Sequence, residues 1–176
     1  SAMTFMVGVG LSVAAMIRVG NQKGLSDFVS LRRIAFSVFI LTLLIEIVFA
    51  VMFLLLRDWL PTLYLDTNNI AKTIENSEVI LIASELLIIV ALFQIFDGLQ
   101  VAILGALKGM QDVKIPTLIT FIAYWIIGFP ICFYLGLHTP LKSAGIWIGL
   151  SVGLVSASIM LFIRFNYLTK KLIIKN

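Results

Sequence analysis

The chain has 176 residues, of which 61% are hydrophobic and 12% are charged, and its mean hydropathy is +1.10. A soluble domain has roughly 45–50% apolar and about 25% charged residues, so this composition excludes a water-soluble fold. The net charge of +4 comes from basic residues that stand singly beside apolar runs. This pattern argues against a nucleic-acid surface and indicates membrane topology.

Five apolar segments follow one another along the chain. About 20 helical residues, each rising about 1.5 Å, cross a hydrocarbon core of roughly 30 Å. We therefore predict an all-α, polytopic membrane helix bundle in a single domain. The five predicted spans cover residues 1–17, 34–56, 79–107, 115–137 and 143–163. Because the first span begins at Ser1 without a signal-peptide pattern before it, we expect a piece of a longer protein.

Most basic residues lie in the connections after the first, third and fifth spans. The connections after the second and fourth spans hold only Arg57, Lys72 and Lys142. By the positive-inside rule, the C-terminus is expected in the cytoplasm and residue 1 near the outer face. The connections predicted to be cytoplasmic contain the other ten of the 13 basic residues: Arg18, Lys23, Arg32, Arg33, Lys108, Lys114, Arg164, Lys170, Lys171 and Lys175.

Glu46 stands in the middle of the second span, between Ile45 and Ile47. A carboxylate is costly in hydrocarbon, and ionisable residues in spans generally face a bundle interior or a water-filled path. The sequence offers Glu46 no visible partner. Three interpretations stay open: a second ion site, a counter-charge for a substrate, or a protonated carboxyl that joins two helices.

Asp97 lies in the third span, where Gln94, Asp97 and Gln100 are spaced by three and are expected to form one polar stripe. A buried aspartate is stabilised by a bound Na⁺ or by a proton, and it can exchange one for the other. We predict Asp97 as the cation-coupling residue, with Gln94 and Gln100 as polar neighbours. A purely structural hydrogen bond to another helix is the alternative. Glu85, a further candidate carboxylate, lies about 120° round the helix and roughly 18 Å away, too far to share an ion with Asp97.

The last two spans contain helix-packing signals. Pro116 stands where a helix begins, whereas Pro130 follows Gly128 inside the fourth span and is expected to kink or break it. In the fifth span small residues recur every fourth position, which predicts close packing of a neighbouring helix. These small residues are Gly145, Gly149, Gly153 and Ala157.

Enzyme and metal chemistry lack their usual motifs. The single Cys132 and the single His138 exclude an internal disulfide and a Cys/His zinc site. The sequence has no glycine-rich phosphate loop, no G-x-S-x-G elbow and no H-E-x-x-H helix. We therefore predict a transporter that is not an enzyme and has no cofactor besides a coupling ion.

Two stretches resemble the multidrug and toxic compound extrusion (MATE) family. Residues 12–24, SVAAMIRVGNQKG, are similar to a family helix end in which small residues precede Arg-Val-Gly-Asn. Residues 94–116, QIFDGLQVAILGALKGMQDVKIP, resemble the tenth-helix signature and the inner loop after it. YWIIGFP at 124–130 and GIWIGL at 145–150 follow in the family's order, so the resemblance covers nearly the whole chain.

The resemblance implies a twelve-helix transporter with two six-helix lobes. Residues 1–176 would supply helices eight to twelve, a partial C-terminal lobe, and helix seven and the N-terminal lobe would be missing partners. A Na⁺ or H⁺ gradient would drive antiport of organic cations and other xenobiotics out of the cell, across the inner (plasma) membrane, by alternating access. The family's tenth-helix aspartate corresponds to Asp97. Phe93 stands where the family commonly has tyrosine, which removes a hydroxyl from the neighbourhood of the ion.

Two other functions are compatible with the composition. A lipid-linked oligosaccharide flippase of the same superfamily should have cationic residues facing its cavity to bind pyrophosphate, but no Lys or Arg lies well inside spans two to five. A membrane scaffold that transports nothing would also be all-helical. For such a scaffold, Asp97→Asn should leave activity intact.

Overall fold

The computed structural model describes residues 2–57, 59–60, 73–140 and 142–175. Every regular element within these ranges is helical, and five helical spans are long and apolar enough to cross a membrane. The predicted all-α bundle is confirmed. The elements are α1 (Ala2–Gly24), α2 (Phe28–Leu55), α3 (Thr73–Gly109), α4 (Lys114–Phe121), the π-helix η3 (Ile122–Gly128), α5 (Phe129–His138) and α6 (Lys142–Lys175).

Several helices continue beyond the predicted spans. The first helix ends at Gly24, the second begins at Phe28, and the last runs to Lys175. The predicted spans followed apolar side chains, whereas a helix is held by backbone hydrogen bonds whether its side chains face lipid or water. The connection between α1 and α2 is therefore much shorter than the gap between the predicted spans.

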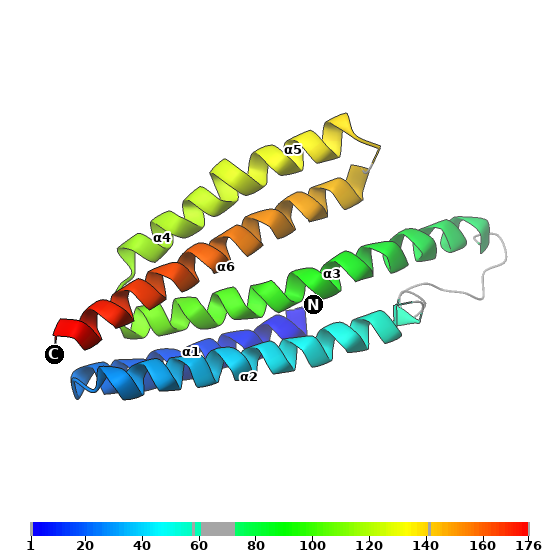
Figure 1. The fold of residues 1–176 in the computed structure, drawn as a ribbon. Helices are drawn as coiled ribbons and strands as arrows, with labels where there is room; N and C mark the ends of the chain where they lie inside the picture. The colour runs from blue at the N-terminus through cyan, green and yellow to red at the C-terminus, as the bar shows by residue number, and fades with distance from the viewer. Residues whose placement is uncertain (1, 58, 61–72, 141, 176) are drawn as a thin grey trace.

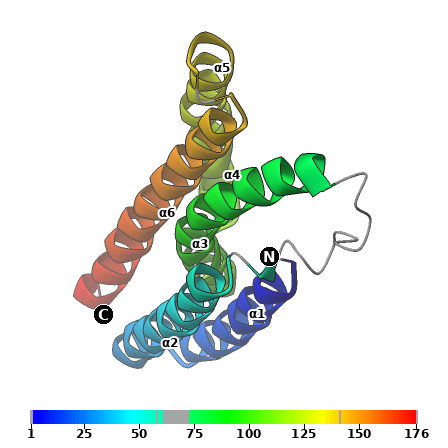
Figure 2. The ribbon, with the colours of Figure 1, turned by 90° about the vertical axis from the view of Figure 1, so that its right-hand side faces the viewer.

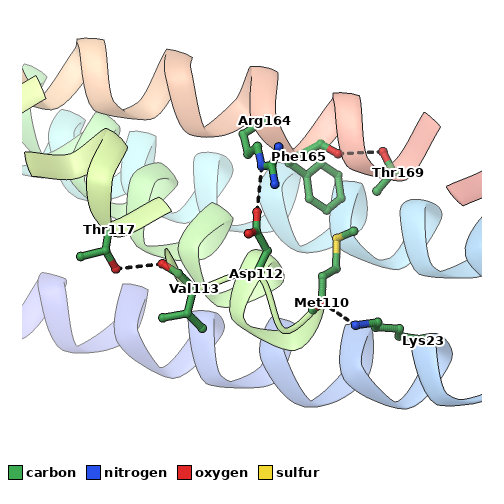
Figure 3. Close-up of polar contacts among 8 residues, drawn as sticks. All are labelled: Lys23, Met110, Asp112, Val113, Thr117, Arg164, Phe165 and Thr169. Carbon is green, nitrogen blue, oxygen red and sulfur yellow. Dashed lines mark hydrogen bonds and ion pairs between the residues drawn. The ribbon is translucent and has the colours of Figure 1, made fainter. Parts of the chain in front are cut away.

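The α1–α2 turn, the α3–α4 turn and the last part of α6 lie at the same end of the bundle (Figure 1). Lys23 Nζ donates to the Met110 carbonyl oxygen at 2.6 Å, and Arg164 Nε pairs with Asp112 Oδ2 at 2.9 Å (Figure 3). The expectation that the basic connections share one side is thereby confirmed. We call this end the basic end; it includes Lys23, Arg32, Arg33, Lys108, Lys114, Arg164, Lys170 and Lys171.

Helices α2 and α3 both contribute to two apolar cores, which lie at different positions along these helices. The larger, here called the basic-end core, also receives side chains from α1 and α6. Its aromatic centre is the edge-to-face pair Phe39 and Phe165, with ring centroids 5.2 Å apart. The smaller core, toward the other end, contains Ala50, Phe53 and Ala91. The basic-end core consists of Ala15, Val19, Leu31, Ala35, Phe39, Ala102, Ile103, Ala106, Leu107, Met110, Leu161 and Phe165.

Helix α3 lies between the α1–α2 hairpin and the hairpin formed by α5 and α6 (Figures 1 and 2). Small residues make its approach to α1 close, since a Cβ on Gly109 would stand 2.5 Å from the Met16 carbonyl oxygen. The same holds between α5 and α6, where a Cβ on Gly149 would stand 2.5 Å from the Cys132 nitrogen and one on Gly145 equally close to the Leu135 oxygen. The predicted packing of the small-residue stripe is confirmed.

The fourth predicted span is one continuous helical run, Lys114–His138, and is not broken at Pro130. A π-helix precedes the proline instead: the Phe129 N–H donates to the carbonyl oxygen of Tyr124, five residues earlier. Proline has no N–H to donate, and a π-helical turn is one way in which a helix absorbs such a defect. Pro116 lies in the first turn of α4, as predicted.

Candidate functional site

A layer of polar side chains lies inside the bundle between the two apolar cores. The buried face of α2 runs from Phe39 in the basic-end core through Glu46 to Ala50 in the small core. On α3 the buried residues likewise lead from Ala91 in the small core, through Gln94, to residues of the basic-end core. We call this the central polar layer; it comprises Thr4 of α1, Thr42 and Glu46 of α2, and Gln94 and Asp97 of α3.

Glu46 is the most deeply placed carboxyl in this layer, with 1% of its surface exposed. It lies in a slot between two glycines of neighbouring helices. A Cβ on Gly98 of α3 would stand 2.6 Å from Glu46 Cγ, and a Cβ on Gly8 of α1 would stand 3.4 Å from Glu46 Oε1. The absence of both side chains leaves room for a carboxyl at the meeting point of three helices.

The sequence offered Glu46 no partner, and the structure corrects this. Its polar neighbour is the side-chain amide of Gln94, which is 4% exposed. Gln94 Oε1 in turn accepts a hydrogen bond from the Thr4 hydroxyl at 3.0 Å. Among the buried side-chain atoms of the described residues, Glu46 Oε2 and Gln94 Nε2 have no hydrogen bond. The hydrogen bonds of Glu46 and Gln94 are thus incompletely satisfied.

Asp97 is half-buried on α3, directly before Gly98. It has no hydrogen bond to another described residue, and it lies close enough to Glu46 and to Tyr124 for its charge to act on both. The alternative in which Asp97 serves as a fixed hydrogen-bond partner of another helix gains no support from these contacts. Its carboxyl is held by no hydrogen bond among the described residues.

Gln94 and Gln100 face different neighbours. Gln94 points toward Thr4 of α1, whereas Gln100 Oε1 accepts a hydrogen bond from the Tyr124 hydroxyl of η3 at 2.8 Å. Six residues turn a helix by about 600°, which leaves the two amides some 120° apart. The predicted stripe therefore divides, and Asp97 stands between its two branches.

The remaining predicted residues lie apart from this layer. Phe93 packs edge-to-face on Trp147 of α6, with ring centroids 5.9 Å apart. The Glu85 side chain lies outside the described part of the structure. Among the described residues no three His, Cys, Asp or Glu side chains gather as a metal-binding group.

Sequence reasoning missed Thr4, Gly8 and Gly98 as parts of the site. For Gly98 a signal was present: a glycine directly after the intramembrane Asp97 lets a second helix approach. For Thr4 there was none, because its partner Gln94 is 90 residues away in the chain.

A separate cavity of about 350 Å³ lies between α3 and α6. Its lining comes from Ile89 and Leu92 of α3 and from α6 between Ile148 and Ser156, and it is apolar apart from two serines. None of the predicted site residues lines it. It offers apolar contact but no charge.

The family model MatE matches residues 1–134 of this chain. A probable multidrug resistance protein NorM of Rhodopseudomonas palustris is 41% identical over 170 residues, which are 97% of this chain and 35% of that protein. The multidrug resistance protein MdtK of Yersinia enterocolitica is 35% identical over 175 residues, again 97% of this chain and 36% of the relative. The chain therefore spans about a third of the length of these relatives.

Solved structures have the same fold. The eukaryotic MATE transporter AtDTX14 superposes with a TM-score of 0.82 at 20% identity, over 97% of this chain and 37% of its own. An inward-facing multidrug resistance MATE family transporter of the MOP superfamily superposes with a TM-score of 0.80 at 16% identity, over 97% and 38%.

Proposed function

Since this chain belongs to the MATE family, a family of transporters and not of enzymes, we propose that it is part of a cation-coupled antiporter that exports organic cations. The antiporter works in the bacterial inner membrane, with its C-terminus in the cytoplasm. The chain supplies helices eight to twelve, and helix seven and the N-terminal lobe complete the transporter. The extent of the matches, about a third of each relative, supports this assignment.

The observation that carries the proposal is the environment of Asp97. Its carboxyl stands within a span, half-buried, with no hydrogen bond among the described residues. A carboxylate in such surroundings is stabilised by binding a cation. The multidrug resistance relatives supply the class of cargo.

Coupling follows from a shift between two populations. A cation that binds Asp97 favours the conformation in which it binds more tightly, and loss of the cation favours the other. Outside the cell the cation favours release of the organic cargo, and inside its departure favours uptake of new cargo. This exchange is antiport.

Na⁺ and H⁺ both fit the donor set. Carboxylate and amide oxygens suit a hard cation; the Asp97 charge acts on the Glu46 carboxyl, and Gln94 stands three residues before Asp97 on α3. A proton needs the Asp97 carboxyl alone. Asp97 would hold Na⁺, which would supply a positive charge at the carboxylate.

The test is efflux of ethidium from energised cells that express the complete coding sequence. Wild type and Asp97→Asn are compared at equal membrane abundance, under an imposed Na⁺ gradient and under an imposed proton gradient. Asp27→Asn is the matched control, because it makes the same chemical change in an exposed carboxylate outside the spans. We expect wild type and Asp27→Asn to extrude ethidium and Asp97→Asn to lose most of this activity.

The gradient that supports efflux identifies the coupling ion. Equal efflux by wild type and Asp97→Asn would remove Asp97 from the mechanism. If wild type extrudes neither ethidium nor other organic cations, the export proposal fails and the flippase becomes the function to test.

A further inference from the structure

The end of α6 has two opposite faces. Phe165 and Thr169 on one face are fully buried in the bundle. The other face is open and has a hollow of about 560 Å³. At about 100° per residue, the positions that line this hollow fall within about 100° of the helix circumference. We call it the basic hollow; its lining residues are Tyr167, Lys170, Lys171 and Ile174.

The basic hollow combines positive charge with apolar surface. Lys170 and Lys171 are exposed, and neither has an ion pair or a hydrogen bond with another described residue. Tyr167 is 57% exposed and Ile174 is 85% exposed. The residues that line the hollow include no carboxylate. An anionic group would therefore meet two charged donors here, and a hydrocarbon chain attached to it would meet apolar side-chain surface.

The Tyr167 ring is held in place by a neighbouring ion pair. The Arg164 guanidinium lies over this ring, with Cζ 6.0 Å from the ring centroid. Its Nε also donates to Asp112 Oδ2 at 2.9 Å (Figure 3). Because Asp112 offsets the charge of Arg164, the net positive charge at the hollow comes from the two lysines.

Helix α6 is long enough to carry the hollow to the level of the lipid headgroups. Its 34 residues rise about 51 Å, against roughly 30 Å for the hydrocarbon core and about 40–45 Å for the bilayer with its headgroup regions. The hollow lies in the last turns of the helix, at the basic end (Figure 1). Tyrosine is enriched at this level of a membrane, and long lysine side chains reach toward the headgroups from it.

We propose that the basic hollow binds the headgroup of an anionic phospholipid. The phosphate lies between Lys170 and Lys171, the glycerol and the first acyl carbons pack on Tyr167, and Ile174 forms the outer rim. Charge complementarity selects the lipid, because basic pockets beside membrane helices attract anionic headgroups. A zwitterionic headgroup would bring its own cation close to the lysines. The inference goes beyond the proposed function and requires only that α6 crosses a membrane.

Native mass spectrometry of the full-length protein in detergent tests this. Phosphatidylglycerol and phosphatidylcholine with the same acyl chains are titrated separately, and the dissociation constant of the first bound lipid is measured. We expect wild type to bind phosphatidylglycerol more tightly than phosphatidylcholine. Lys170→Gln combined with Lys171→Gln should weaken phosphatidylglycerol binding at least about tenfold, since each basic residue strengthens such binding roughly fivefold. Binding of phosphatidylcholine should hardly change.

Arg33→Gln combined with Lys108→Gln is the matched control, because it removes two charges from exposed residues at the same end of the bundle. It should weaken phosphatidylglycerol binding less than about twofold, because neither residue lines the hollow. Lys170→Arg combined with Lys171→Arg keeps both charges and should retain the wild-type affinity. This pair separates loss of charge from loss of fold.

Equal weakening by the two charge-removing variants would mean that overall charge attracts the lipid, and would overturn the proposal. Unchanged affinity after Lys170→Gln with Lys171→Gln would also overturn it, and is the result expected if another part of the full-length protein covers the hollow. Displacement of the lipid by an equal concentration of glycerol phosphate would show a site for free phosphate, again against the proposal. Lipid binding is measured without transport, so it can fail while ethidium export succeeds, and the reverse.

Discussion

The basic end and the central polar layer both contain charged and polar side chains. These side chains form ion pairs and hydrogen bonds at the basic end, whereas some in the layer lack a partner. At the basic end Arg164 pairs with Asp112, Lys23 binds a backbone carbonyl, and Arg32 donates to Asn166 at 3.0 Å. In the layer, Glu46 and Gln94 each keep an atom without a partner among the described residues. The Arg164 and Asp112 side chains are partly exposed, whereas Glu46 and Gln94 are 1% and 4% exposed.

The two regions differ in the free-energy cost of leaving a polar group unpaired. Near water an unpaired group is simply hydrated, so its pairing contributes little, typically below about 1 kcal/mol. In the interior an unpaired group costs about 1–3 kcal/mol or more. An unpaired group at the meeting point of three helices therefore lowers the stability of the folded protein unless water or a ligand satisfies it.

Among these variants, Gly98→Ala should lower the free energy of unfolding the most. Its Cβ would stand 2.6 Å from Glu46 Cγ, and overpacking of a core typically costs about 1–3 kcal/mol. We expect the free energy of unfolding to fall by about that amount, measured by thermal denaturation of the purified protein. Gly10→Ala is the matched control, because a Cβ at Gly10 meets nothing within 4 Å.

The double variant Gly98→Ala with Glu46→Ala should recover part of the stability that Gly98→Ala loses, because the side chain that clashes is gone. A double variant no more stable than Gly98→Ala would mean that the glycine serves some contact other than Glu46.

The Arg164–Asp112 ion pair should have a smaller effect. The two side chains are 21% and 16% exposed, so solvent still screens the pair. A double-mutant cycle with Arg164→Met and Asp112→Asn should yield a coupling energy of about 0.2–1 kcal/mol. A coupling energy above about 3 kcal/mol would mean that the pair behaves as a buried ion pair. It would contradict the conclusion that pairing at the basic end contributes little to stability.

Replacing Asp27 should have the smallest effect on stability, and this effect should be confined to the first turn of α2. Its carboxylate accepts from the Ser30 N–H at 3.0 Å, and hydrogen bonds from Ser30 hold the pKa of Asp27 below its ordinary value of 3.8. A lowered pKa means that the cap is fully formed above that ordinary value and is lost as pH falls through the lowered one.

Amide exchange at Ser30, corrected for its intrinsic pH dependence, tests this. Protection should be constant at neutral pH, should decline only in strong acid, and should be reduced in Asp27→Ala at every pH. Global thermal stability should hardly change. A decline near neutral pH would contradict the assignment of Asp27 as the capping group.

The sequence alone determined the membrane class, the five spans, the gathering of basic connections at one end and the family. These are properties of composition, length and order, which a one-dimensional pattern contains in full. It also singled out Asp97 and Glu46 as candidate site residues, because an ionisable residue stands out within an apolar run.

Only the tertiary structure decided how those residues meet. Helix rotation sends Gln94 to Thr4 and Gln100 to Tyr124, although the sequence placed both amides on one stripe. The slot for Glu46 exists because Gly8 and Gly98, from helices far apart in the chain, approach the same point. Which faces of long apolar helices pack together depends on side-chain volumes summed over whole interfaces, and no local pattern records that sum.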